Sequence, residues 1–382
     1  MIAIGLLGVG PALAWLYLLF GRSGFWRCRE RDDAELPDPP RWPSVTAIVP
    51  ARNEADTIRT CVASLLGQDY RGTFRVIVVD DQSTDRTGEL AQSVRSAALM
   101  VLTGSERPAG WAGKVWAMHQ GLERALADFT RTPEYIWFTD ADISHRPDTL
   151  ARLVARAEAP GGLALVSLMA RLSCHTRAEK FLIPAFVYFF QLLYPFATVN
   201  NPRSRTAAAA GGCMLARTAA LRRAGGLRPI PNAIIDDCAL ARLLKTQGPI
   251  WIGLTNRSVS LRIYDHFADI RRMVTRTAFV QLRCSPVLLL GTLSGLGVIF
   301  VAPVFAALFA RGIPEFAGLC AWAAMAVSFG PMLRFYGRPA WWGVLVPLIA
   351  SVYGAFTLES AILYWLGRGG NWKGRIQAAR GV

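Results

Sequence analysis

The sequence predicts an α/β fold in which a doubly wound, mainly parallel sheet is combined with helices that cross a membrane. Within residues 44–285, short apolar runs alternate with stretches of helical character, a pattern typical of parallel strands joined by helices. The chain is also more apolar than an ordinary soluble domain. Of its 382 residues, 52% are hydrophobic and the mean hydropathy is +0.29, which indicates membrane segments.

The N-terminal segment, residues 1–21, is predicted to be a transmembrane anchor, because residues 2–20 carry no charge and are long enough to cross a bilayer. No basic stretch precedes them and no small-residue cleavage site is evident, so we expect an uncleaved anchor and not a signal peptide. Residues 22–43 are rich in arginine and then in proline, which predicts a linker. By the positive-inside rule, these arginines place the next domain in the cytoplasm.

Five apolar runs of the central domain are predicted to be buried strands. Candidate helices lie between them, such as residues 56–66 and 86–96. The predicted strands are residues 45–49, 76–79, 99–102, 136–138 and 163–168.

Acidic residues follow apolar runs at three places in this domain. The carboxyl ends of parallel strands meet at one edge of a sheet, where open α/β sheets bind their ligands. An Asp-x-Asp sequence at such an edge suits a hard divalent cation that bridges the phosphates of a nucleotide. The three places are Asp80-Asp81, Asp140-Ala-Asp142 and Asp236-Asp237.

Residues 181–199 form another uncharged stretch inside the same domain. If they crossed a membrane, Asp236 and Asp237 would lie on the opposite side from Asp140 and Asp142, and no common site would form. We therefore expect an in-plane helix at the membrane surface, or a buried helix that leans on the membrane.

Three further apolar stretches, residues 287–310, 313–333 and 341–366, are predicted to cross the membrane within a region over residues 286–367. The protein is therefore expected to be a multi-pass protein of the cytoplasmic (inner) membrane. Three crossings leave the basic tail, residues 368–382, on the outer side, against the positive-inside rule. Either the rule fails here or one apolar segment is re-entrant. Interface anchors are expected at Trp341, Trp342, Trp365 and Trp372.

The net charge of +15 comes from 42 basic against 27 acidic residues. Nucleic acid is not the expected partner, because no basic tract is interleaved with an aromatic stacking platform. Membrane lipids are the expected partner instead, since arginines beside membrane segments contact anionic headgroups. The seven cysteines show no zinc-binding spacing, and disulfides are not expected in a reducing cytoplasm.

Three motifs follow one another in the central domain: Ile48-Val-Pro-Ala-Arg-Asn-Glu54, Val78-Val-Asp-Asp-Gln-Ser-Thr-Asp-Arg-Thr87 and Thr139-Asp-Ala-Asp142. In this order they resemble family 2 glycosyltransferases, which have the GT-A fold. Other stretches resemble the hopene-associated glycosyltransferases of the HpnB type. These are Gly110-Trp-Ala-Gly-Lys-Val-Trp-Ala-Met118, Ile235-Asp-Asp-Cys238, Leu333-Arg-Phe-Tyr-Gly337 and Trp372-Lys-Gly-Arg375.

The resemblance implies a donor site formed by the first two motifs. Pro50, Arg52 and Glu54 would line the nucleoside pocket, and Asp81, together with Asp80, would hydrogen-bond the uracil or ribose. The alternative for the two aspartates is a turn or a helix cap.

For the third motif, the resemblance implies that Asp142 binds Mg²⁺ or Mn²⁺ directly, while Asp140 reaches the donor sugar or the metal through water. Two acids suffice, since Mg²⁺ is usually held by one or two carboxylates plus phosphate. His145 is a candidate auxiliary ligand, but an isolated histidine in a loop is more often a solvated surface group. Lys114 would contact the diphosphate.

Asp237 corresponds to the family's catalytic base, which deprotonates the acceptor hydroxyl, and Asp236 stands beside it where relatives often have Glu. Arg276 would also contact the diphosphate. Processive relatives carry (Gln/Arg)-x-x-Arg-Trp at this place, but here Thr277 follows the arginine. The missing tryptophan argues for transfer of a single sugar.

The resemblance thus implies an inverting, metal-dependent hexosyltransferase that moves one sugar from a nucleotide-sugar, a UDP-sugar, to a membrane lipid such as a hopanoid or a polyisoprenoid. Two alternatives stay open: a processive polysaccharide synthase, and a non-catalytic membrane scaffold that binds nucleotide-sugar. The lost tryptophan and the small number of spans weigh against the first alternative. Retention of every acidic residue weighs against the second.

Overall fold

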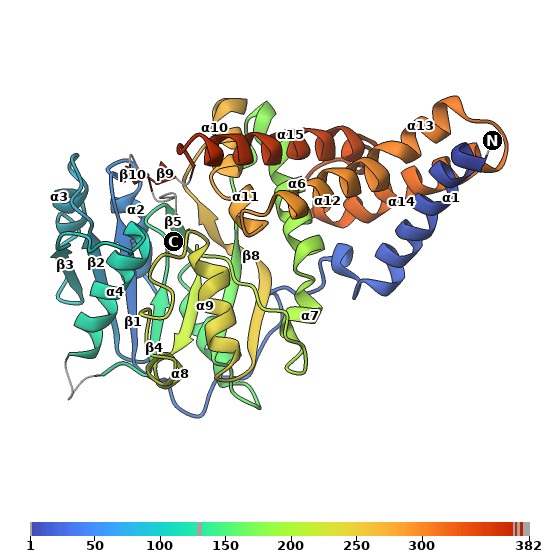
Figure 1. Cartoon of the computed structure of the whole chain (residues 1–382). Coiled ribbons are helices and arrows are strands. Elements are labelled where there is room, and N and C mark those ends of the chain that lie inside the picture. The colour runs from blue at the N-terminus through green and yellow to red at the C-terminus, as the bar shows by residue number, and fades with distance from the viewer. Residues whose placement is uncertain (1, 128–131, 370, 373–374, 377–382) are drawn as a thin grey trace.

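The computed structural model describes residues 2–127, 132–369, 371–372 and 375–376. Two regions make up the molecule, a sheet domain and a group of long helices that extends away from it (Figure 1). The fold confirms the predicted α/β class and places the C-terminal apolar stretches in helices.

In the part of the chain that the structure describes, the sheet has eight strands in the order β3-β2-β1-β4-β7-β6-β8-β5. Parallel pairs join β1 to β2 and β4, β2 to β3, and β6 to β8, whereas β7 and β5 run antiparallel to their neighbours. The strands are β1 Val45–Ala51, β2 Phe74–Asp80, β3 Leu99–Thr103, β4 Tyr135–Phe138, β5 Ile143–His145, β6 Leu165–Arg171, β7 Met214–Arg217 and β8 Ile250–Ser260.

All five predicted strands are present, as β1, β2, β3, β4 and β6. Because β7 is antiparallel to both β4 and β6, those two strands run in the same direction, and their carboxyl ends lie at one edge. Helices cover both faces, which explains why every residue of β1 is buried. Ala47 and Val49 pack with α2 and α5, and Ile48 packs with α4. The helices of this domain are α2 Ile58–Leu66, α3 Thr87–Gln92, α4 Gly113–Leu126, α5 Thr149–Glu158, α8 Thr218–Arg223 and α9 Asp236–Lys245.

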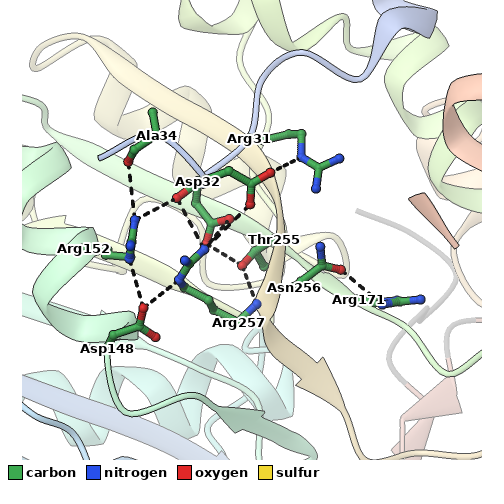
Figure 2. A network of polar contacts seen from close by, with 10 residues as sticks. Arg31, Asp32, Ala34, Asp148, Arg152, Arg171, Thr255, Asn256 and Arg257 are labelled. Atoms are coloured by element: carbon green, nitrogen blue, oxygen red, sulfur yellow. Dashed lines mark hydrogen bonds and ion pairs between the residues drawn. The ribbon is translucent and has the colours of Figure 1, made fainter. Parts of the chain in front are cut away.

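The segment predicted as a linker is bound to the sheet. The N–H of Asp32 donates to the carbonyl of Leu254 in β8 at 3.1 Å, and the N–H of Leu254 donates to the carbonyl of Glu30 at 2.8 Å. Figure 2 shows Arg257 between Asp32 and Asp148, with ion-pair distances of 3.4 and 2.9 Å. The chain is therefore fixed along β8 before it enters β1.

Among the described residues, three helical segments are long and apolar enough to cross a membrane: Pro286–Phe309, Ile313–Phe335 and Ala340–Trp365. Their surfaces expose large apolar side chains, including Val287 (78% exposed) and Ile313 (76%). Such a surface is costly in water and suits a lipid environment. The elements are α12 Pro286–Leu296, η3 Gly297–Val301, α13 Ala302–Phe309, α14 Ile313–Phe335, η4 Ala340–Leu345 and α15 Val346–Trp365.

The N-terminal helix α1, Ile2–Leu16, continues into a π-helical turn, η1, over Tyr17–Gly21. It packs along α13 and α14, and the indole N–H of Trp15 donates to the carbonyl of Ile299 at 2.8 Å. In the described residues its apolar part, Val9–Gly21, is shorter than a membrane span. A crossing by α1 remains a prediction.

The apolar stretch at residues 181–199 lies mostly in α6, Arg177–Leu193, followed by α7, Phe196–Asn200. Figure 1 shows α6 between the sheet and the C-terminal helices. The hydroxyl of Tyr188 bonds that of Ser328 in α14 at 2.7 Å, and the hydroxyl of Tyr353 in α15 donates to the carbonyl of Leu182 at 3.0 Å. One side of α6 is thus buried inside the protein. Two short helices, α10 Phe267–Thr275 and α11 Ala278–Gln281, pack against α15 beside it.

Candidate active site

Lys114 connects two of the three acidic places found in the sequence. It lies in the first turn of α4, and its Nζ is 2.7 Å from Oδ1 of Asp140 and 3.1 Å from Oδ2 of Asp236. Asp140 follows β4, and Asp236 begins α9. Burial alone would lower the pKa of Lys114, but the two carboxylates raise it above its usual range. The lysine is therefore a fixed positive charge between the two acids.

Asp237 is held in place by two backbone groups. Its Oδ2 accepts the N–H of Gly211 at 3.1 Å, and its Oδ1 accepts the N–H of Cys238 at 2.7 Å. Burial and the neighbouring Asp236 raise the pKa of Asp237 to about 6, although Lys114 opposes the rise. Part of the residue remains exposed to solvent. A carboxylate with this pKa can accept a proton near neutral pH.

Gly211 fills the space between these groups. A Cβ at this position would lie 3.1 Å from Nζ of Lys114, 3.6 Å from Oδ2 of Asp237 and 3.7 Å from Oδ2 of Asp140. The glycine thus lets the backbone approach three charged side chains at once. The loop before β7 therefore closes one side of the site.

Asp142 belongs to a second group of charges, beside the first. Nε of Arg262 lies 2.9 Å from its Oδ2, and Nη2 of the same arginine lies 3.1 Å from Oε1 of Glu54. Burial and the charge of Asp140 raise the pKa of Asp142, and Arg262 opposes the rise. Sequence reasoning missed Arg262. Its position just after β8 was the available signal, but β8 itself was not predicted.

Asp140 and Asp142 suit a divalent cation. In the described part of the chain, no group of three or more His, Cys, Asp or Glu side chains could hold a metal on its own. Mg²⁺ needs only one or two carboxylates when substrate phosphates complete its shell. These two carboxylates already attract positive groups, since Lys114 and Arg262 are paired with them. The donor set therefore fits a metal that arrives with a nucleotide.

The first two motifs meet at the ends of β1 and β2. Pro50 lies beside Val79 in the parallel register, and Nη1 of Arg52 donates to the carbonyl of Asp81 at 2.5 Å. Asp81 is fully buried. Asp80 accepts the N–H of Ser83 at 3.0 Å, so its carboxylate stabilises the turn after β2. Glu54 connects this area to Asp142 through their shared arginine.

Arg276 lies at the rim of the site. It is exposed at the end of α10 and forms no ion pair within the described residues. It lies near Tyr264, whose pKa burial raises to about 12 while Arg262 and Arg276 oppose the rise. Contact of Arg276 with the diphosphate stays a prediction.

His145 is neither a surface group nor free to bind a metal as placed. It is 4% exposed, and its ring nitrogens lie 2.8 Å from the hydroxyl of Thr139 and 2.9 Å from that of Ser258. Burial lowers its pKa to about 3, so the imidazole is neutral. Its role is to connect β5 to β8 next to Asp142.

The family model described as glycosyl transferase family 2 matches residues 46–225. Over this segment, the chain is similar to family 2 glycosyltransferases. Asp236, Asp237 and Arg262 lie beyond the matched segment, on elements packed against it.

Relatives of this domain are only partly similar to the chain. An N-acetylglucosaminyltransferase of Mesorhizobium japonicum is 31% identical over 38% of this chain and 33% of its own length. The 4,4'-diaponeurosporenoate glycosyltransferase of Staphylococcus haemolyticus is 29% identical over 41% of this chain and 39% of its own. The chain thus spans about a third to two-fifths of the length of these curated relatives.

A solved structure extends the likeness to the whole fold. The mannosyltransferase PcManGT of Pyrobaculum calidifontis, in complex with GDP-Man and Mn²⁺, matches 93% of this chain and 97% of its own with a TM-score of 0.52. The sequence identity is 22%, so the likeness concerns the fold. It confirms the GT-A arrangement predicted for the sheet domain.

Proposed function

We propose that the protein is an inverting, metal-dependent glycosyltransferase that moves a single sugar from a nucleotide-sugar to a membrane lipid. The observation that carries the proposal is the position of Asp237. This carboxylate has a raised pKa and lies beside a lysine paired to Asp140 of the Asp-x-Asp motif. A base and a phosphate-binding cation are thus held together at the ligand-binding edge of a GT-A sheet.

The donor is a UDP-sugar bound across the ends of β1, β2 and β4. Pro50, Arg52 and Glu54 form the nucleoside side of the pocket, with Asp81 as the hydrogen-bond acceptor. Asp80 shapes the turn beside it, as its bond to a backbone N–H supports. The diphosphate contacts Lys114, whose ammonium is paired with carboxylates that a metal can take over.

Asp142 would hold Mg²⁺ or Mn²⁺ directly, and Asp140 would reach the metal through water or contact the donor sugar. When bound, the metal neutralises the departing diphosphate. The complex of PcManGT with Mn²⁺ supports a divalent ion in this fold. Arg262 must then give up its contact with Asp142, and Arg276 can approach the diphosphate from the rim.

Asp237 removes the proton from the acceptor hydroxyl as that oxygen attacks the anomeric carbon from the face opposite the diphosphate. The two backbone N–H groups aim the carboxylate, and Asp236 keeps Lys114 beside it. Asp237 accepts only the proton and forms no bond to the sugar. The sugar therefore passes directly to the acceptor, with inversion at the anomeric carbon.

The acceptor is a lipid, of the hopanoid or polyisoprenoid kind, reached from the side of the apolar helices. Tyr194, at the end of α6, accepts a hydrogen bond from Gln281 of α11. Burial and Cys238 raise the pKa of Tyr194, and Asp237 adds to the rise, which puts the base near these helices. We further propose a place in the cytoplasmic membrane with the sheet domain in the cytoplasm.

The test is UDP release by the purified protein in lipid extract with Mg²⁺ or Mn²⁺, followed by transfer of a labelled sugar and lipid extraction. Label in the organic phase that depends on Asp237 supports single transfer to lipid. Label in an insoluble polymer would instead support a processive synthase. UDP binding without release would support a scaffold.

A further inference from the structure

A second charged surface lies at the C-terminal end of α14, away from the catalytic groups. Arg334 lies in the last turn of α14, and Arg338 follows Gly337, whose left-handed backbone (φ 67°) reverses the chain. Arg31 precedes β1 along the chain, and Arg171 ends β6. We call Arg31, Arg171, Arg334 and Arg338 the arginine cluster.

Aromatic rings bring members of the cluster together. The guanidinium carbons of Arg31 and Arg171 lie 5.0 and 5.8 Å from the ring centroid of Phe335. That of Arg338 lies 5.1 Å from the ring of Trp342. Stacking of this kind positions a guanidinium group and leaves its N–H donors free to bind an anion.

Most of this positive charge is not neutralised by the protein. Within the described residues, Arg171, Arg334 and Arg338 form no ion pair with a carboxylate. Arg171 donates to the neutral amide oxygen of Asn256 at 3.2 Å. Nε of Arg338 is buried without a hydrogen-bond partner in the same part of the chain. A buried donor of this kind costs free energy until an acceptor reaches it.

Nearby carboxylates are already engaged elsewhere. Asp32 and Asp148 pair with Arg257, as Figure 2 shows, and the guanidinium group of Arg31 points away from them. Arg31 pairs with Asp33, which is half exposed. These three acids therefore stabilise the segment along β8. Glu30 is the exception: it lies near Arg31 and Arg334, since all three act on the pKa of the buried Cys28, but it forms no ion pair among the described residues.

Positive charge also converges on a neighbouring thiol. Burial raises the pKa of Cys174 and Glu179 adds to the rise, while Arg338, Arg171 and Lys180 oppose it. Glu179 itself accepts backbone N–H groups at the start of α6 and from Tyr264. These three cations come from different elements of the fold, so the positive potential is a property of the surface and not of one helix.

The place of the cluster suits a lipid headgroup. Phe335 ends a helix that is long and apolar enough to cross a membrane, and Trp341 and Trp342 follow it. Tryptophans are enriched where a bilayer meets water. Solvated arginines beside a span are the simpler explanation, but they do not account for the buried Nε of Arg338 or for stacking on shared rings.

We propose that the arginine cluster binds the phosphate of an anionic phospholipid where α14 meets the membrane surface. Guanidinium groups pair with phosphate through two parallel hydrogen bonds, and basic pockets beside membrane helices bind anionic headgroups. The site holds a resident lipid and takes no part in sugar transfer. It rests on the proposed membrane location of α14 and not on the proposed chemistry.

The test uses the full-length protein in a neutral detergent, with bound lipid counted by native mass spectrometry after addition of phosphatidylglycerol or phosphatidylcholine. The unmodified protein is expected to retain phosphatidylglycerol in preference to phosphatidylcholine. Arg171→Gln with Arg338→Gln should reduce that retention about tenfold, because charge-assisted hydrogen bonds are lost. The matched control is Arg29→Gln with Arg311→Gln, two exposed arginines outside the cluster, which removes the same charge.

If both double variants lost the same amount of bound phosphatidylglycerol, general surface charge would explain the binding, and the proposal would be overturned. Equal retention of both lipids by the unmodified protein, or displacement of the lipid by an equal concentration of inorganic phosphate, would also overturn it. If the glutamine variant melts early, Arg171→Lys with Arg338→Lys replaces it. This pair keeps the charge and loses the bidentate geometry, so retention should fall between the two extremes.

Discussion

The sheet domain contains two Asp-Asp pairs, and their surroundings differ. Asp80 and Asp81 close β2, where the first is bonded to the turn and the second is fully buried. Asp236 and Asp237 open α9 and face Lys114, which pairs with the first of them. Both pairs therefore follow an apolar run, and each has a basic residue nearby: Arg52 donates to the backbone carbonyl of Asp81, whereas Lys114 pairs with the carboxylate of Asp236.

This difference is the basis of the different roles that we propose for the two pairs. Asp237 lies beside a second carboxylate and is largely buried, so its pKa rises, while Lys114 keeps the group charged near neutral pH. Asp80 has a hydrogen bond to a backbone N–H, which fixes a turn and requires no proton transfer. The predictions below test this division of roles, beginning with the largest expected effect.

Asp237→Asn should reduce sugar transfer by about 10²–10⁴-fold, because an amide keeps the shape of the carboxylate and cannot accept the proton. UDP affinity should stay close to that of the unmodified protein. Turnover and UDP binding are measured on the same preparation. Asp269→Asn, at a half-buried acid that caps α10, is the matched control. Transfer above about a tenth of the normal rate would remove Asp237 as the base.

Asp142→Asn should reduce transfer roughly a hundredfold or more, since a metal contributes several kcal/mol at such a transition state. Mn²⁺ binding in the presence of UDP, followed by electron paramagnetic resonance, should weaken in parallel. Asp148→Asn removes an acid that is also paired with an arginine but lies in the network along β8, and it should leave Mn²⁺ binding unchanged. Unaltered Mn²⁺ affinity in Asp142→Asn would contradict the assignment of this ligand.

The rate of transfer should rise with pH through about 6, because Asp237 must lose its proton before it can act as a base. Asp236 raises that pKa by charge repulsion, so Asp236→Asn should move the acid limb of the kcat profile to lower pH. UDP binding measured over the same pH range separates a change in the pKa of Asp237 from a weaker affinity for the donor. An acid limb that stays in place would show that another group controls the rate.

The smallest effect is expected at the first pair. Asp80→Asn retains an oxygen that can accept the N–H of Ser83, so UDP affinity and the melting temperature should change little. Asp81→Asn should weaken UDP binding about tenfold, as expected when one hydrogen bond to a charged group is lost. If Asp80→Asn proves the more damaging of the two, the roles of these neighbours must be exchanged.

Much of the sheet could be predicted because its parallel strands are buried on both faces. A continuous apolar run then marks the strand, as in Val76–Val79 of β2, where Asp80 marks the end. The antiparallel strands carry a weaker signal. β7 has four residues, and β8 includes polar residues such as Asn256 and Arg257, so neither forms an uninterrupted apolar run.

The same weakness explains which parts of the site escaped prediction. Arg262 acts through its position after β8, and no local pattern separates it from the other basic residues of an arginine-rich chain. His145 was expected in a loop, but short strand β5 pairs with β8 and buries it between two hydroxyl groups. Contacts between residues more than a hundred positions apart decide both cases, and sequence spacing does not record them.

The burial of α6 has a consequence for how the protein is made. Glu179, in the first turn of α6, accepts the N–H of Tyr264 at 2.7 Å and so supports the loop that carries Arg262. Farther along, Leu182 and Tyr188 are bonded to α15 and α14, which are synthesised well after α6. The loop of Arg262 therefore reaches its final support only after α14 and α15 have left the ribosome. A nascent chain without its C-terminal helices would leave the apolar face of α6 uncovered and this side of the site unfinished.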